Sequence, residues 1–100
     1  MLNIIRQTEG NSVCISLKGR LDSITSSELE KELASVTDGD VSSIRLDLAE
    51  LDYISTAGLQ ILLDLARTMD NKGELKFLNV KKDIMEVFEI TRFTDILTIE

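Results

Sequence analysis

Two adjacent hydroxyl side chains, Ser55 and Thr56, stand at the junction between an extended stretch and an apolar stretch with the period of a helix. Both residue types are good helix caps, but a helix start needs only one such side chain. If Ser55 caps the helix, Thr56 takes the first helical position with its hydroxyl free. The junction therefore predicts one hydroxyl that the fold does not use.

Gly58, within the first turn of the same helix, is the second unusual residue of this stretch. Glycine costs about 1 kcal/mol relative to alanine inside a helix, which suggests that another backbone comes close, and a partner surface would explain this. The junction also lies beyond a strand's carboxyl end, where ligands and partners of open α/β sheets usually act. Residue types alone leave a second interpretation open, in which Ser55 and Thr56 are redundant caps and Gly58 makes room for a neighbouring strand.

The chain lacks the residues and motifs that most small enzymes need. It has no histidine, which excludes Ser-His-Asp and Cys-His arrangements and histidine zinc sites. It has no phosphate-binding loop and no Gly-x-Gly-x-x-Gly turn. Asp38 and Asp40 supply too few oxygens for a calcium ion and are interpreted as a solvated turn. We therefore expect a protein that is not an enzyme and that uses no cofactor or metal.

Charge and composition indicate which partners the chain would accept. The formal net charge is −7, and no basic tract interrupts it. Such a surface repels phosphate backbones and anionic lipid, so we expect no direct nucleic-acid or membrane binding, whereas a basic protein partner is compatible. The N-terminal residues lack the pattern of a signal peptide, which favours a cytoplasmic location. Cys14, the single cysteine, falls in a predicted strand and is interpreted as a buried, inert thiol.

The elements that must position this junction alternate along the chain. Period-two patterns predict strands, and apolar positions three and four apart predict helices. In chain order we predict a strand over 2–8, a tight turn at 9–11, a strand over 12–18, a helix from Thr25 to about Val36, a strand over 44–48, a connecting stretch to Ser55, a helix over 57–69, a strand over 75–78, a helix over 83–91 and a short strand over 96–99. Right-handed crossovers then predict one α/β domain, residues 1–100, with a mixed, mostly parallel sheet and an antiparallel first strand.

The two helices nearest the junction carry specific expectations. In the first, Thr25 should cap, Glu28 should reach back as in a capping box, and Ile24 should pack on Leu29 as a hydrophobic staple. The helix over 57–69 should be mostly buried because only one narrow stripe of it is polar. That stripe consists of Gln60, Asp64, Arg67 and Asn71.

Two motifs resemble the signatures of the STAS-domain anti-sigma factor antagonists. The stretch Leu51-Asp52-Tyr53-Ile54-Ser55-Thr56-Ala57-Gly58-Leu59, preceded by Leu46-Asp47-Leu48, is similar to the family's central signature, in which a strand leads through Asp-Ser-Ser-Gly-Leu into a helix. The stretch Leu17-Lys18-Gly19-Arg20-Leu21-Asp22-Ser23 is similar to the family's Gly-x-Leu-Asp turn. Both motifs lie at family spacing, so the resemblance covers nearly all of the chain.

The resemblance implies a function for the junction. In that family, the first serine after the aspartate is phosphorylated by a partner anti-sigma factor that is an ATP-dependent serine/threonine kinase, and the matching residue here is Thr56. The unphosphorylated form binds the anti-sigma factor and frees the sigma factor, phosphorylation abolishes this binding, and a phosphatase resets it. The family's aspartate falls on Ser55, which brings no charge, and its second serine falls on Ala57.

The resemblance also implies a partner-binding surface, made of Asp22, Ser55, Thr56, Ala57, Gly58 and Leu59. Asp22 should lie near Thr56 because both loops emerge at the same edge of the sheet. The alternative for Asp22 is a turn-capping side chain. We expect a monomer or a weak dimer.

Two other functions remain open. The chain could be a STAS scaffold or regulatory subunit whose loop is never modified, which the departures at Ser55 and Ala57 permit. A small enzyme would require a cofactor or metal that no motif supports.

Overall fold

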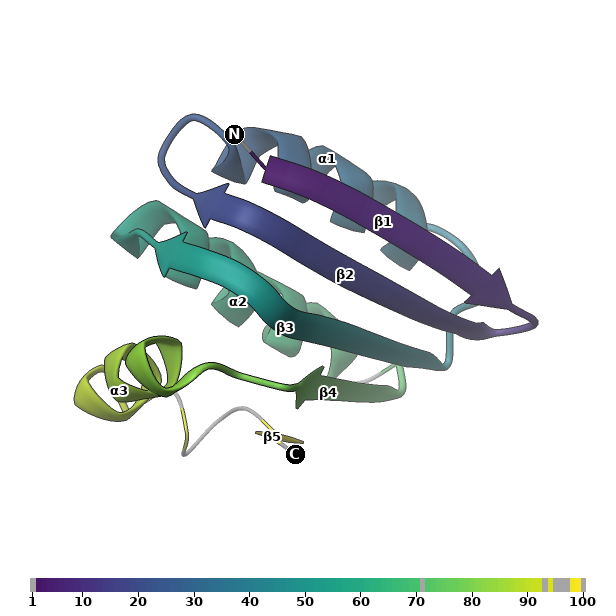
Figure 1. The fold of residues 1–100 in the computed structure, drawn as a ribbon. Coiled ribbons are helices and arrows are strands. Elements are labelled where there is room, and N and C mark those ends of the chain that lie inside the picture. Colours follow the sequence, from purple (N-terminus) through teal and green to yellow (C-terminus); the bar gives the residue numbers. More distant parts are fainter. Residues whose placement is uncertain (1, 71, 93, 95–97, 100) are drawn as a thin grey trace.

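The computed structural model describes residues 2–70, 72–92, 94 and 98–99, and these form an α/β fold (Figure 1). In chain order the elements are β1 (Leu2–Glu9), β2 (Ser12–Leu21), α1 (Ser26–Thr37), β3 (Ser43–Ile54), α2 (Thr56–Met69), β4 (Glu74–Leu78), α3 (Lys82–Ile90) and β5 (Thr98–Ile99). The strands form one sheet in the order β1-β2-β3-β4-β5. The pair β1–β2 is antiparallel and the other pairs are parallel, which confirms the predicted sheet.

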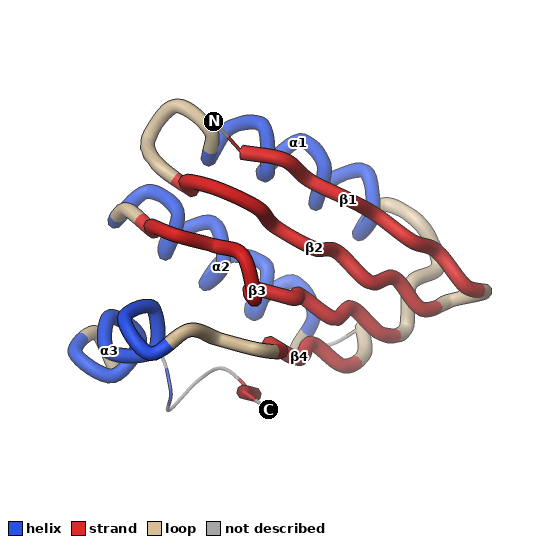
Figure 2. Tube along the Cα trace, in the orientation of Figure 1, coloured by secondary structure: helices blue, strands red, loops and turns tan. Residues whose placement is uncertain are grey.

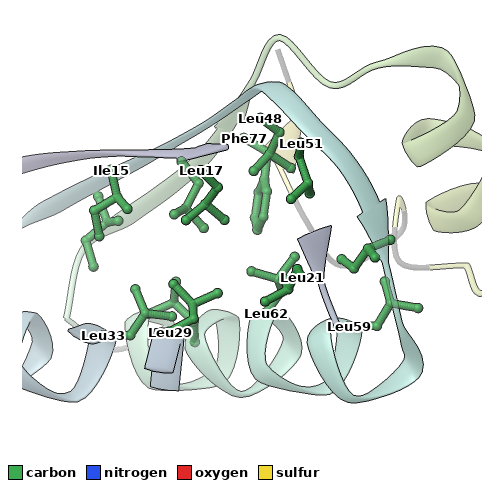
Figure 3. Close-up of a cluster of buried hydrophobic side chains, with 14 of the residues drawn as sticks. Ile15, Leu17, Leu21, Leu29, Leu33, Leu48, Leu51, Leu59, Leu62 and Phe77 are labelled. Atoms are coloured by element: carbon green, nitrogen blue, oxygen red, sulfur yellow. The ribbon is translucent and has the colours of Figure 1, made fainter. Parts of the chain in front are cut away.

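The core lies between the sheet and the two helices α1 and α2, which cover the same face (Figure 1). Burial of their apolar side chains drives this packing, at about 1.5 to 3 kcal/mol for each large side chain. Figure 3 shows side chains from the sheet meeting side chains from the helices, among them Ile15, Leu17 and Phe77 from the sheet and Leu29, Leu33 and Leu62 from the helices.

The β1–β2 hairpin forms at the predicted turn, where Gly10 takes a left-handed φ of 60°. Val13, Ile15 and Leu17 face the core, as the period of two predicts. Cys14 lies in β2, but it is only half-buried because it alternates onto the opposite face of the sheet. The interpretation of Cys14 as a fully buried thiol is therefore wrong.

The second and third strands are both longer than predicted, and β2 continues through Gly19, Arg20 and Leu21, which were expected in the turn after it. The segment 49–54, expected to be a connection, continues β3. The β2–β3 register shifts at residues 16–18 and again at 19–20 of β2, and each shift accommodates one extra residue of β3. Such bulges break the period of two, which is why the pattern indicated that the strand had ended. The buried side chains of this part of β3 are instead three residues apart, at Leu48, Leu51 and Ile54.

The start of α1 differs from the predicted capping box. Thr25 is the N-cap residue by position, but its side chain makes no capping hydrogen bond. Its backbone N–H donates to Oδ1 of Asp22 at 2.9 Å. Asp22 therefore takes the acceptor role that was expected of the Glu28 carboxylate. The hydrophobic staple is also wrong, because Ile24 is 77% exposed while Leu29 is fully buried.

The elements of the second half of the chain lie close to their predicted bounds. The prediction that α2 is mostly buried is wrong, because only five of its 14 residues are buried. The predicted polar residues Gln60, Asp64 and Arg67 are exposed, and so is Thr68. Asn71, and positions 96 and 97 of the predicted last strand, lie outside the described residues. Gly73 separates α2 from β4, and a side chain there would clash with the Ser42 carbonyl oxygen, 2.0 Å from an added Cβ. α3 packs on β3 and places Phe88 edge-on against Phe77, with ring centroids 6.0 Å apart.

Candidate functional site

The loops that follow β2 and β3 lie at the same end of the sheet, where these two strands finish (Figure 2). The Ser55 backbone N–H donates to the Leu21 carbonyl oxygen at 2.8 Å, which joins the last residue of β2 to the residue after β3. We call residues 22–25 and 55–57 together the loop edge. Asp22 and Thr56 each follow one partner of this hydrogen bond, so the structure brings the two predicted loops together.

Ser55 caps α2. Its backbone is extended, with φ −93° and ψ 172°, and its Oγ accepts a hydrogen bond from the Gly58 N–H at 3.2 Å. The Ser55 carbonyl oxygen accepts from the Leu59 N–H at 2.9 Å, which starts the helical hydrogen-bond series. The helix therefore begins at Thr56, and the predicted division between a capping serine and a first helical threonine is confirmed.

Thr56 is exposed, and its hydroxyl makes no hydrogen bond to any residue within the described ranges. It lies at the N-terminus of a 14-residue helix, where the first backbone N–H groups lack partners within the helix. These groups give the helix start a partial positive charge, which favours a nearby anion by about 0.3 to 1 kcal/mol on a surface. The position can accept a negative group without losing an existing contact.

Gly58 is buried, and the expectation that a partner backbone lies beside it is wrong. A Cβ on Gly58 would lie 2.7 Å from Cγ of Leu21 and 3.1 Å from Cγ1 of Ile54. The glycine therefore makes room for side chains of β2 and β3, as the alternative interpretation held. Leu59 is also buried, at 6% exposure. Both residues support the loop edge from inside.

The remaining predicted contact residues lie at the surface or close to it. Thr56 is exposed, while Asp22, Ser55 and Ala57 are half-buried. These four residues belong to the loop edge and define the candidate site.

Asp22 performs the turn-capping role. Its Oδ1 accepts from the N–H groups of Ile24, at 3.0 Å, and Thr25, at 2.9 Å. These hydrogen bonds, with that from the Thr25 N–H contributing most, hold the pKa of the Asp22 carboxyl below its usual value despite the opposing effect of burial. Asp22 is therefore a charged acceptor that fixes the loop, and it contributes a negative charge to the loop edge.

The buried Thr25 side chain also stabilises this loop. It is only 6% exposed, its Oγ1 donates to the Arg20 carbonyl oxygen at 2.7 Å, and it accepts from the Asp22 N–H at 2.9 Å. The hydroxyl therefore both donates and accepts a hydrogen bond within the fold.

Charged and aromatic side chains of the β3 end flank the loop edge. Asp52 pairs with Lys81 at 2.8 Å, and this hydrogen bond raises the pKa of the Lys81 ammonium group. The Arg20 guanidinium stacks on the Tyr53 ring, 4.3 Å from its centroid. The sequence did not reveal the Arg20–Tyr53 pair, because the bulges that set its register leave no alternation to follow. It did not reveal the Asp52–Lys81 pair, because these residues are 29 positions apart.

No helix in the described part of the chain is long and apolar enough to cross a membrane. No three histidine, cysteine, aspartate or glutamate side chains gather there as a metal site would require.

The sequence matches the family model of the STAS domain over residues 3–100. The chain belongs to the STAS domain family. It is 39% identical over 84 residues to BtrV of Bordetella bronchiseptica, whose name assigns it to the anti-sigma factor antagonists, with 83% of this chain and 72% of that protein covered. It is 29% identical over 97 residues to the anti-sigma-B factor antagonist of Staphylococcus aureus, with 96% and 90% covered.

The STAS fold of this chain is also seen in solved structures. Unphosphorylated SpoIIAA, an anti-sigma factor antagonist, superposes with a TM-score of 0.85 at 18% identity, covering 98% of this chain and 88% of that one. Phosphorylated SpoIIAA from Bacillus superposes with a TM-score of 0.78 at 18% identity, covering 98% and 91%. At this identity the likeness shows the fold, and it extends to both forms of SpoIIAA.

Proposed function

We propose that this STAS chain is an anti-sigma factor antagonist that phosphorylation of Thr56 switches off. In the unmodified state, the loop edge binds a kinase-type anti-sigma factor, which then releases its sigma factor. The same partner phosphorylates Thr56, and a phosphatase restores the unmodified state. The chain itself catalyses no reaction in this scheme and works in the cytoplasm as a monomer or weak dimer.

The division of work between Ser55 and Thr56 carries this proposal. Ser55 supplies the cap of α2, so the fold does not depend on the Thr56 hydroxyl. Thr56 is exposed and unbonded within the described residues, and a kinase therefore has access to it. The names of BtrV and of the S. aureus relative support the same class of function.

Electrostatics explain how a phosphate would act as a switch. The group adds about −1.5 to −2 charges and three acceptor oxygens. The helix start tolerates an anion, so the fold should survive, as the shared fold of both SpoIIAA forms supports. Within an interface, the dianion would need desolvation beside the charge of Asp22. This cost of about 2 to 4 kcal/mol corresponds to a roughly 30- to 1,000-fold loss of affinity.

The departures from the family signature affect the rate of phosphorylation. Ser55 caps without the charge that an aspartate would bring, and threonine has a branched carbon next to its hydroxyl. We expect Thr56→Ser to be phosphorylated at least as fast as the wild type, since it removes this branch and keeps the hydroxyl.

The test uses the purified kinase-type anti-sigma factors of the source organism. Each is incubated with the full chain and ATP, and phosphopeptide mass spectrometry locates the modification. We expect phosphate on Thr56 and none on Thr56→Ala. By calorimetry, Thr56→Ala should bind the partner with wild-type affinity, and Thr56→Asp should bind at least about 30-fold more weakly.

Thr68→Ala is the matched control, because Thr68 is an exposed threonine on the same helix, three turns from the site. It should leave both phosphorylation and binding unchanged. If Thr56→Ala and Thr56→Asp bind with equal affinity, phosphorylation of Thr56 does not control binding. The same follows if Thr56 stays unmodified in cells and in vitro, and the scaffold function then remains.

A further inference from the structure

The most exposed apolar side chain of the loop edge is Ile24. It is 77% exposed and does not pack on Leu29, its expected staple partner, which is fully buried. Single exposed apolar side chains are common on protein surfaces. Three features distinguish Ile24: hydrogen bonds hold its backbone, it lies beside the candidate site, and acidic residues stand on both sides of it in the sequence.

Hydrogen bonds hold the backbone of Ile24 on both sides. The Ile24 N–H donates to Asp22 Oδ1 at 3.0 Å, and the Ile24 carbonyl oxygen accepts from the Ser27 hydroxyl at 3.0 Å. The Ser26 N–H donates to the Asp22 carbonyl oxygen at 2.9 Å and closes the turn. The loop thus presents the isoleucine in a fixed position, which lowers the entropy lost when a partner buries it.

Ile24 lies at the same edge of the sheet as Thr56. It is three residues beyond Leu21, whose carbonyl oxygen bonds the Ser55 N–H. A partner that covers Thr56 closely enough to be expelled by a phosphate would also reach the neighbouring loop (Figure 2).

Acidic side chains stand on both sides of Ile24 in the sequence, while the Arg20 guanidinium, four residues before it, stacks on the Tyr53 ring. Asp22 precedes it, and Glu28 stands exposed in the first turn of α1. A complementary partner surface would therefore offer an apolar pocket with basic side chains around it.

We propose that Ile24 is the apolar anchor of the loop edge and inserts into an apolar pocket, rimmed by basic residues, on the anti-sigma factor. This inference rests on the proposed function and names a contact that the phosphorylation switch does not itself require. It also separates two roles: Ile24 supplies affinity, and Thr56 controls it.

The test measures the affinity of Ile24→Ala and Ile24→Asp for the purified anti-sigma factor that binds the wild-type chain. Removing the anchored side chain should raise Kd about 10- to 100-fold for alanine, and aspartate should raise it further. Thermal unfolding should stay at the wild-type temperature, since the side chain is exposed. Phosphorylation of Thr56 should still weaken the residual binding.

Ile90→Ala is the matched control, because Ile90 is 81% exposed on α3, outside the loop edge. It should leave Kd unchanged. If Ile24→Ala binds with wild-type affinity, or if Ile90→Ala loses as much affinity, Ile24 is not the anchor. The proposed function still holds in that case as long as Thr56→Asp binds the anti-sigma factor weakly. If sedimentation shows that Ile24→Ala abolishes only self-association, the occupant is a second copy and the proposal is wrong. If no anti-sigma factor binds the wild type, the proposed function fails and the anchor with it.

Discussion

Two threonines stand at the starts of two parallel helices at the same edge of this sheet, and the fold treats them differently. Thr25 is buried, and its hydroxyl bonds the backbone of Arg20 and of Asp22. Thr56 is exposed, and its hydroxyl bonds nothing among the described residues. The difference shows that the Thr25 hydroxyl stabilises its loop, whereas a neighbouring residue stabilises the start of the helix at Thr56.

The neighbour is Ser55. Because it caps α2, the hydroxyl after it is released from any role in folding. A regulatory modification requires this separation, since a phosphate on a structural hydroxyl such as that of Thr25 would unfold the loop. The comparison can be tested by changing each side chain in turn.

The largest effect on stability is expected at Thr25. Thr25→Val keeps the shape but removes the hydrogen bonds that the hydroxyl makes to the Asp22 N–H and to the Arg20 carbonyl oxygen. This should lower the free energy of unfolding by about 2 to 3 kcal/mol in urea titrations. Thr56→Val, the matched change, should stay within about 0.5 kcal/mol of the wild type. Similar losses in both variants would mean that the two threonines do not differ as described.

Gly58→Ala comes next. The new methyl group would overlap Leu21, at a cost of about 1 to 3 kcal/mol, and the better helix propensity of alanine returns about 1 kcal/mol. We expect a net loss of up to about 2 kcal/mol in chemical unfolding.

A double-mutant cycle sharpens this prediction. Leu21→Ala removes the atom that the new methyl group would meet, so Gly58→Ala should cost less in that background. If the losses in the free energy of unfolding are strictly additive, contact with Leu21 does not explain why position 58 is a glycine.

Ser55→Ala should cost about 1 kcal/mol, the usual value of a lost N-cap. Ser55→Asp, which restores the residue of the family signature, keeps a capping oxygen and adds a charge that the helix start favours by about 0.3 to 1 kcal/mol. It should therefore be at least as stable as the wild type. A stable Ser55→Ala would show that Thr56 can take over the cap, and the separation of roles would be lost.

The smallest effect is a pH dependence from Asp22. Its pKa is lower in the folded chain, because its charged form accepts hydrogen bonds from Thr25 and Ile24. The carboxylate therefore stabilises the fold above the pKa of an unfolded aspartate, about 4, and this contribution is lost as pH falls through the lower folded value. The advantage of wild type over Asp22→Asn in urea titrations should shrink below about pH 4. A constant difference down to pH 2 would contradict this origin.

Much of the fold was predictable because most elements keep one clear period. The β1–β2 hairpin, α1, α2 and β4 follow the spacing of their apolar residues, and Ser55 was recognisable as the cap of α2. The end of β3 was not predictable, because its buried residues change from a spacing of two to a spacing of three at the bulges.

The errors at the site have a common cause. The capping box and the staple at α1 depended on Glu28 and Ile24, and both patterns ignored Asp22, which lies outside the helix and takes the Thr25 N–H first. The partner interpretation of Gly58 failed because Leu21, distant in sequence, fills the space beside it. Helix patterns describe the helix itself well, but they carry no information about which side chain outside the helix, near or distant in sequence, takes the same group or fills the same space.

The decisive measurement compares the full chain phosphorylated stoichiometrically on Thr56 with its unmodified form. We expect phosphorylation to weaken binding to the anti-sigma factor at least about 30-fold, and to change the free energy of unfolding by less than about 1 kcal/mol. Retained binding, or lost binding together with an unfolded chain, would contradict this expectation.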